Sequence, residues 1–358
     1  MREPTTFTDA GLPCMIMRGG TSRGAFFLAD DLPAAAAERD DLLRRVMGSP
    51  DVRQTDGIGG SHPLTSKVAI VSRSADPRAD IDYLFLQVGV DDLTVSDRQN
   101  CGNILAAVGQ FAVERGLVAA HGRQASVRIR MVNSTGYARS TFALREGKVD
   151  YQRTVDTVGV PFPGARCEIE LIDTAGSVCG ALLPTGSPVD TVNGIAATCI
   201  DNGMPIVLVS AADLGVTGYE TIGELEADHT LRQNRERLRV AAGEAMGLGK
   251  VSELTIPKVC LIAPARLGGA ISTRTFIPLR CHASIGVLAA AGVAAACQIT
   301  GTVAAALAMP PLHPCRLEVP AGTFTIEVAV DEGACGPVVT HTSVVRAARK
   351  IFDGTVYP

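Results

Sequence analysis

Tryptophan is absent from this chain, and aromatic residues make up only 4% of its 358 residues. Proteins that stack nucleic-acid bases need exposed aromatic rings, so the composition argues against such a platform. A basic excess is missing too, because 33 Lys and Arg residues face 37 Asp and Glu residues and the formal net charge is -4. Without a positive surface field, nucleic-acid binding is not expected.

Closely spaced cysteine pairs are also missing. The ten cysteines are scattered, and none stand in a C-x-x-C spacing. A zinc ribbon or dithiol redox motif is therefore not indicated, the chain has no H-E-x-x-H motif, and we expect no bound metal. The N-terminal Met-Arg-Glu-Pro-Thr-Thr lacks the charged and then apolar pattern of a signal peptide. We interpret the cysteines as reduced and mostly buried, and we expect a cytoplasmic protein.

No apolar run is long enough to predict a membrane span. The longest one, residues 285–297, falls well short of the roughly 20 residues that a spanning helix needs, so we predict a buried core helix there. Hydrophobic residues make up 46% of the chain and charged residues 20%, as in a globular protein. The length allows a sizeable core and favours two domains over one.

Four segments recur in the same order along the chain. Residues 14–33 resemble 198–215, residues 66–71 resemble 257–262, residues 101–117 resemble 284–300, and the strand-like run 127–132 corresponds to 316–330. Each match is weak alone, but four in order indicate a duplication. The period is far too long for a solenoid, so two pseudo-equivalent domains are predicted.

The third repeated pair predicts helices that are apolar nearly all round and rich in small residues. Such helices must be enclosed, and the segments around them have the patterns of strands. We therefore predict an α+β protein of two pseudo-equivalent domains, each a curved sheet or β-barrel around a central helix. The first domain is predicted to span residues 1–184 and the second 185–342, with a crossing at 182–188. Residues 341–358 have the pattern of a helix and a strand, and 343–358 are a candidate for a return to the first domain.

The start of each repeated helix is a candidate anion site. Unpaired backbone N–H groups and the positive end of the helix dipole favour carboxylates there, and two facing starts would suit a polycarboxylate. Cys101 stands at the first start, where a thiol ionises more easily, although a small buried packing residue is the alternative. The equivalent position in the second half is Ser284, so a racemase with two opposed cysteines is not predicted.

Lys67 is a candidate base because it stands where a polar loop enters an apolar strand. Partial burial lowers the pKa of a lysine and brings it closer to the working pH. An ordinary lysine at a strand edge is the alternative. Its counterpart in the repeat is Lys258, which lacks the same glycine- and hydroxyl-rich surroundings and is interpreted as structural.

The glycine-rich loop Arg18–Gly24 is a candidate carboxylate-binding segment. Arg18, Gly19, Gly20, Thr21 and Ser22 offer backbone N–H groups, hydroxyls and a guanidinium group, although a plain hairpin turn fits equally well. The loop has neither G-x-G-x-x-G spacing nor a Walker lysine, so nucleotide binding is not supported.

Three polar residues just before the second helix are further candidates. Arg274, Arg280 and His282 could hold a distal carboxylate, or His282 could act as a second acid. The alternative for His282 is a structural histidine.

Long segments of the chain resemble one known family. MRGGTSRGAFF, MGSPDVRQTDGIGG, SHPLTSKVAIV, QNCGNILAAVG, CGALLPTG, CIDNGMPIVL and RCHASIGV are similar to motifs of the 2-methylaconitate cis-trans isomerases and 4-oxalomesaconate tautomerases. The resemblance covers nearly the whole chain, and CIDNGMP, Arg274–Pro278 and RCHASIGV look closer to the tautomerase branch.

The resemblance implies the diaminopimelate-epimerase-like fold, in which two similar barrels each enclose a helix. It also implies that Lys67 and Cys101 face each other across the substrate; which is the acid and which the base stays open. Ser284 departs from the two-cysteine pattern of diaminopimelate epimerase, so amino-acid epimerisation is not expected. The candidate substrate-binding set is completed by the motif residues Thr65, Ser66, Gly102, Asn103 and Ser284.

The implied function is a cofactor-independent isomerase that shifts a proton on an unsaturated tricarboxylate, with 4-oxalomesaconate and gallate degradation as the expected substrate and context. One alternative is a 2-methylaconitate cis-trans isomerase, and another is a polycarboxylate-binding protein without turnover. The expected partner is the small-molecule substrate, with neither nucleic acid nor membrane, and a homodimer is a candidate assembly.

Overall fold

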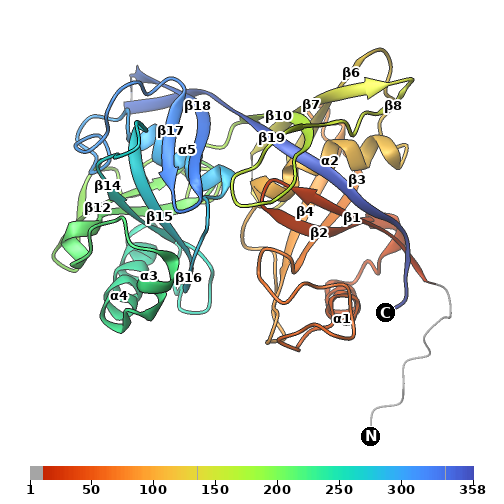
Figure 1. Cartoon of the computed structure of the whole chain (residues 1–358), viewed down its shortest axis with the longest axis horizontal. Helices are drawn as coiled ribbons and strands as arrows, with labels where there is room; N and C mark the ends of the chain where they lie inside the picture. The colour runs from red at the N-terminus through yellow and green to blue at the C-terminus, as the bar shows by residue number, and fades with distance from the viewer. Residues whose placement is uncertain (1–10, 135, 335) are drawn as a thin grey trace, which may run out of the picture.

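Two halves lie side by side, joined by the long C-terminal strand β19 (Gly336–Val356), as Figure 1 shows. The computed structural model describes residues 11–134, 136–334 and 336–358; the N-terminal segment examined for a signal peptide and Cys335 lie outside the described residues. Each half contains one enclosed helix, α2 (Gly102–Glu114) in the first and α5 (Val287–Ala296) in the second. All ten residues of α5 are buried, as predicted for the apolar run.

The first half is a closed barrel of eight strands. In order around the ring these are β1 (Leu12–Gly19), β2 (Ser22–Leu28), β3 (Lys67–Arg73), β4 (Ile81–Val88), β6 (Gln124–Met131), β7 (Tyr137–Arg145), β10 (Gly164–Ile172) and β19, which returns to β1. The short strands β5 (Val95–Ser96), β8 (Lys148–Val149) and β9 (Arg153–Val155) pair at its edges. Side chains alternate between buried and exposed along β6, β7 and β10, and α2 contacts all eight barrel strands.

The second half repeats this order in an open sheet. Its strands are β11 (Asp190–Val192), β12 (Ile195–Asp201), β13 (Pro205–Ser210), β14 (Lys258–Ala263), β15 (Ile271–Ile277), β17 (Cys315–Val319) and β18 (Gly322–Gly333), followed by the first part of β19. Strand β16 (Arg280–Cys281) forms a hairpin with β15. No pairing between described residues closes this sheet into a ring.

The duplication predicted from the sequence is visible element by element. In the first half the hairpin β1–β2 is followed by the 3-10 helix η1 (Ala29–Asp31), helix α1 (Ala36–Met47) and the strand β3, which pairs parallel with β2. In the second half the hairpin β12–β13 is followed by η2 (Ala211–Leu214), helices α3 (Ile222–Ala227) and α4 (His229–Ala245), and the parallel strand β14. Lys67 and Lys258 therefore open equivalent strands.

Strand β19 differs from its prediction. The sequence predicted a helix and a strand in residues 341–358, and the helix is wrong because the whole segment is one extended strand. Its first part pairs with β18, its middle with β10 from Ser343 to Ala348, and its end with β1. Three successive strand partners hold this backbone extended, a tertiary constraint that local patterning does not contain. The division into domains at residue 184 stays a prediction.

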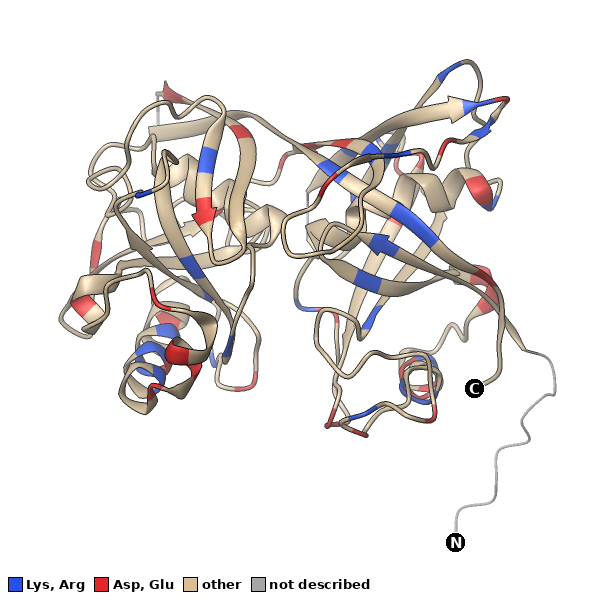
Figure 2. Ribbon diagram, in the orientation of Figure 1, with Lys and Arg blue, Asp and Glu red and all other residues tan. Residues whose placement is uncertain are grey.

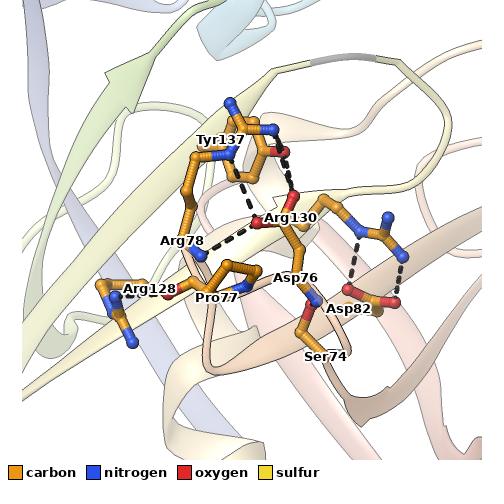
Figure 3. A network of polar contacts seen from close by, with 8 residues as sticks. All are labelled: Ser74, Asp76, Pro77, Arg78, Asp82, Arg128, Arg130 and Tyr137. Atoms are coloured by element: carbon orange, nitrogen blue, oxygen red, sulfur yellow. Dashed lines mark hydrogen bonds and ion pairs between the residues drawn. The ribbon is translucent and has the colours of Figure 1, made fainter.

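A network of charged and polar side chains ties the turn between β3 and β4 to the outside of β6 and β7 (Figure 3). The Tyr137 hydroxyl donates to Asp76 at 2.5 Å, Arg130 Nε donates to Asp82 at 2.8 Å, and Arg128 donates to the carbonyl of Pro77 at 3.1 Å. The charged partners Arg130 and Asp82 are partly exposed, so ion pairs of this kind contribute little to stability and mainly fix geometry.

Charges of both signs are mixed over both halves in the view of Figure 2. Among the described residues, no helix combines the length and the apolar character that crossing a membrane requires.

Candidate active site

The starts of the two enclosed helices meet between the halves. Gly102 is the first residue of α2, and a Cβ atom built on it would lie 2.7 Å from Cβ of Val287, the first residue of α5. Each start presents backbone N–H groups without helical partners and the positive end of a helix dipole. The arrangement expected from the duplication, two helix starts directed at one place, is therefore present.

A cavity of about 70 Å³, here called the central cavity, lies at this meeting point. Of the predicted site residues it is lined by Ser22, Lys67, Cys101, Gly102, Asn103 and His282. None of the described lining residues is Asp or Glu, so the cavity combines amines and helix starts with no carboxylate side chain. Such a site favours anions. Across the described part of the chain, no three His, Cys, Asp or Glu side chains are grouped as metal ligands.

Lys67 is held by a fixed amide. Its Nζ donates to Oε1 of Gln87 at 2.6 Å and lies 4.9 Å from the centre of the Phe85 ring. The Gln87 amide nitrogen donates to the carbonyls of Pro63 and Ser66, which leaves its oxygen for the lysine. Burial lowers the pKa of Lys67, while the nearby thiol of Cys101 acts in the opposite direction.

Cys101 caps the start of α2 through its backbone, not its thiol. Its backbone is extended, its side chain makes no capping hydrogen bond, and its carbonyl accepts from the Tyr83 hydroxyl at 3.2 Å and from the Leu105 N–H. Burial raises the pKa of Tyr83 well above its ordinary value, so Tyr83 remains a neutral donor. The thiol is thus held at the cavity wall without being used in the cap.

Lys258 also lines the central cavity, although sequence reasoning treated it as structural. Its Nζ donates to the carbonyl of Thr255 at 2.6 Å. Burial lowers the pKa of Lys258 to about 7, and the positive charges of Lys67 and Arg239 act in the same direction. The repeat alignment with Lys67 was the signal that pointed to this residue.

The glycine-rich loop supports the start of α2 more than it lines the cavity. A Cβ atom on Gly19 would lie 1.9 Å from the Asn103 carbonyl, and one on Gly20, whose φ is +50°, would lie 2.5 Å from the Asn103 side chain. Thr21 accepts a hydrogen bond from Asn103 at 3.0 Å. Only Ser22 reaches the cavity, and its buried hydroxyl has no protein partner. The glycines therefore allow close approach of a helix and not of a ligand.

Arg346 on β19 holds the other side of Asn103, and no sequence pattern pointed to it. Its guanidinium donates to Oδ1 of Asn103 at 2.9 Å and lies 4.3 Å from the centre of the Phe324 ring. Burial lowers the pKa of Arg346 to about 10, and within the described chain it forms no ion pair. A buried, unpaired cation thus stands directly behind the helix start.

His282 is a neutral donor in this environment. Its Nδ1 accepts from the N–H of Ser284 at 2.8 Å, which places the ring proton of the neutral form on Nε2. Burial lowers the pKa of His282 to about 3, assisted by the charges of Lys67 and Arg346. At neutral pH it can donate a hydrogen bond to a carboxylate but does not serve as a cationic acid. Ser284 itself lines a separate cavity with Arg346.

Arg274 and Arg280 do not line the central cavity. Arg274 follows strand alternation to the opposite face of β15 from the cavity-lining Thr275, and it donates to the carbonyls of Glu220 and Thr273. Arg280 lines a neighbouring pocket of about 250 Å³, here called the side pocket. The side pocket shares Lys67 and His282 with the central cavity, so it offers room for a distal group of a ligand.

The remaining predicted residues make protein contacts around the cavity. Arg18 is buried and donates to the carbonyls of Gly20 and Phe162. The Thr65 hydroxyl donates to the carbonyl of His62, and the Ser66 hydroxyl accepts from the side chain of Gln54. These three residues shape the surrounding loops.

Residues 10–358 match the family model described as PrpF protein. The chain belongs to this family. It is 51% identical, over 96% of its length and 95% of the relative's, to a 4-oxalomesaconate tautomerase of Pseudomonas putida. It is 52% identical, over 96% of its length and 97% of the relative's, to a (4E)-oxalomesaconate Delta-isomerase of a Novosphingobium species. The predicted family and enzyme class, an isomerase, are confirmed.

Solved structures confirm the predicted fold. A crystal structure of methylitaconate-delta-isomerase matches with a TM-score of 0.79 and 31% identity, over 97% of this chain and 95% of that one. A hydroxyproline epimerase from Agrobacterium vitis matches with a TM-score of 0.62 over 98% of this chain and 94% of that one. At 14% identity the second likeness concerns the fold alone. The diaminopimelate-epimerase-like architecture predicted from the resemblance is thus the observed one.

Proposed function

We propose that this isomerase interconverts the keto and enol forms of 4-oxalomesaconate, an unsaturated tricarboxylate. One observation carries the proposal: two buried lysines and a thiol line a cavity without acidic side chains, where two helix starts meet. The names of the two relatives at 51% and 52% identity support this substrate.

The chemistry follows from the charge of the cavity. A proton on a carbon between a keto group and a double bond is acidic, because its removal gives a dienolate whose charge spreads over several oxygens. The helix starts and the ammonium groups stabilise that charge as it develops. Lys67 and Cys101 are the proposed proton-transfer groups, one from the start of β3 and one from the start of α2. The His282 ring and the free hydroxyl of Ser22 can bind the substrate carboxylates.

Every step in this scheme moves protons only, so the side chains of the cavity suffice and no cofactor enters it. We place the reaction in gallate degradation. The nine described cysteines are free, which supports the cytoplasmic location expected from the sequence. A homodimer remains a prediction about assembly.

Assays of the purified protein with 4-oxalomesaconate and 2-methylaconitate, run side by side, test the identity of the substrate. We expect turnover of 4-oxalomesaconate, followed by the loss of its keto form, with a much lower kcat/KM for 2-methylaconitate. Activity on 2-methylaconitate alone would replace the proposed substrate with that of the alternative isomerase. Binding of both acids with turnover of neither would indicate a polycarboxylate-binding protein.

A further inference from the structure

The central cavity is too small for the whole of the proposed substrate. A cavity of about 150 Å³ is the size that holds one benzene molecule. The central cavity measures about 70 Å³, and 4-oxalomesaconate is larger than benzene, so part of the bound molecule must extend beyond it. The side pocket, about 250 Å³, adjoins the cavity at Lys67 and His282 and can take that part.

Two histidine rings line the side pocket, and both are fixed in the same way. Nδ1 of His62 accepts from the N–H of Leu64 at 3.1 Å, and Nδ1 of His282 accepts from the N–H of Ser284 at 2.8 Å. Each neutral ring therefore carries its proton on Nε2. Within the described chain neither Nε2 has a hydrogen-bond partner, although the His282 side chain belongs to a residue only 4% exposed. The pocket thus contains two oriented donors, one from each half, that no protein group uses.

The charges around the side pocket favour a single carboxylate. Lys67 and Arg280 are its cations, and Glu226 is the one acidic side chain among its described lining residues. One oxygen of Glu226 accepts a backbone N–H at 3.0 Å. Burial lowers the pKa of His62, assisted by Arg280 and Lys67 and opposed by Glu226, and burial lowers the pKa of His282 to about 3. Both rings are therefore neutral donors at neutral pH, beside a small excess of positive charge.

We propose that the side pocket is the subsite for one terminal carboxylate of the tricarboxylate, which His62 and His282 bind through their Nε2–H groups. The inference rests on the proposed function, because the ligand is the substrate of that reaction. Lys67, at the junction of pocket and cavity, stays beside the reacting carbon while the two rings hold the end of the molecule. His62 is thereby a substrate-binding residue that contributes to the choice of an extended polycarboxylate.

Two substitutions of His62 separate substrate binding from a structural role. In His62→Gln the amide nitrogen can replace Nε2 as a donor, but nothing replaces Nδ1. In His62→Asn the amide oxygen can replace Nδ1 and accept from the Leu64 N–H, but no donor reaches the pocket.

The KM for 4-oxalomesaconate of the full-length variants distinguishes the two roles. We expect His62→Asn to raise KM about 10-fold or more, the effect of losing one hydrogen bond to a charged group, with little change in kcat. His62→Gln should keep a KM close to that of the wild type. His121→Gln, at an exposed histidine, is the control and should match the wild type in both constants.

Nitrogen-15 NMR of the histidine rings gives a second measurement on the wild-type protein. Both rings should be neutral with the proton on Nε2 before substrate is added. Addition of 4-oxalomesaconate should move the Nε2–H proton resonances of His62 and His282 downfield, because each becomes the donor of a charge-assisted hydrogen bond.

The outcomes separate this inference from the proposed function. A wild-type protein that does not turn over 4-oxalomesaconate would overturn both. An active wild type together with an unchanged KM in His62→Asn would overturn the inference alone, as would a KM raised in His62→Gln but normal in His62→Asn, which would make His62 an anchor of its loop. Should the variants not fold, the NMR measurement decides, because Nε2–H resonances that do not respond to the substrate would exclude the two rings as its ligands.

Discussion

At the scale of single residues, the site is unusual for its unpaired buried cations. Arg346 is buried, forms no ion pair with any described residue and donates to Asn103 at the start of α2. A buried charge without an ion-pair partner is costly, because no attraction to an opposite charge offsets the loss of its hydration. We infer that Arg346 is retained for the positive potential and the orientation that it gives to the helix start.

Replacing Arg346 by methionine separates these contributions. We expect Arg346→Met to raise KM about 10-fold, since about 1.4 kcal/mol of lost electrostatic stabilisation corresponds to that factor. The free energy of unfolding, measured with urea, should be unchanged or higher. A variant with a normal KM and a large loss of stability would instead give Arg346 a purely structural role.

At the scale of elements, the strands, the enclosed helices and the duplication could be predicted from the sequence, because each strand and helix has a local hydrophobic pattern and these patterns recur in the same order. Its repeat alignment even paired Lys67 with Lys258, but local surroundings alone made Lys258 look structural. Arg346 could not be predicted, since only the path of β19 across both halves brings it behind Asn103. Arg274 does not line the central cavity, and its motif carried no information about which face of β15 it occupies.

The contact between the starts of α2 and α5 is the element-scale feature that shapes the cavity. In Gly102→Ala the new methyl group would lie 2.7 Å from Val287 Cβ, which is not a flexible side-chain end, so the helix starts must separate. Overpacking of this kind typically costs about 1–3 kcal/mol, and the displaced N–H groups should also lower kcat. Thermal unfolding and steady-state kinetics measure both effects.

Gly223→Ala is the matched control. Gly223 lies in α3, is exposed, and has no heavy atom within 4 Å of a built Cβ. Alanine there should leave kcat unchanged and preserve or slightly raise stability, because alanine favours a helix by roughly 0.5–1 kcal/mol over glycine. If Gly102→Ala and Gly223→Ala had the same kcat and the same thermal stability, the α2–α5 contact would not control the site.

At the scale of the whole molecule, two duplicated halves have diverged around one shared cavity. The first supplies Lys67 and Cys101, the second supplies Lys258 and His282, and β19 runs through both sheets. The substrate thus meets amines from both halves, while the helix starts supply positive potential from both sides.

Deuterium exchange from solvent into 4-oxalomesaconate, followed by proton NMR, tests this arrangement most directly. The wild-type protein and the exposed-lysine variant Lys148→Ala should both exchange the carbon-bound proton rapidly. Lys67→Ala should remain folded but exchange that proton at least about 100-fold more slowly, because one of the two proposed proton-transfer groups is gone. Exchange by Lys67→Ala at the wild-type rate would contradict the assignment of proton transfer to this cavity.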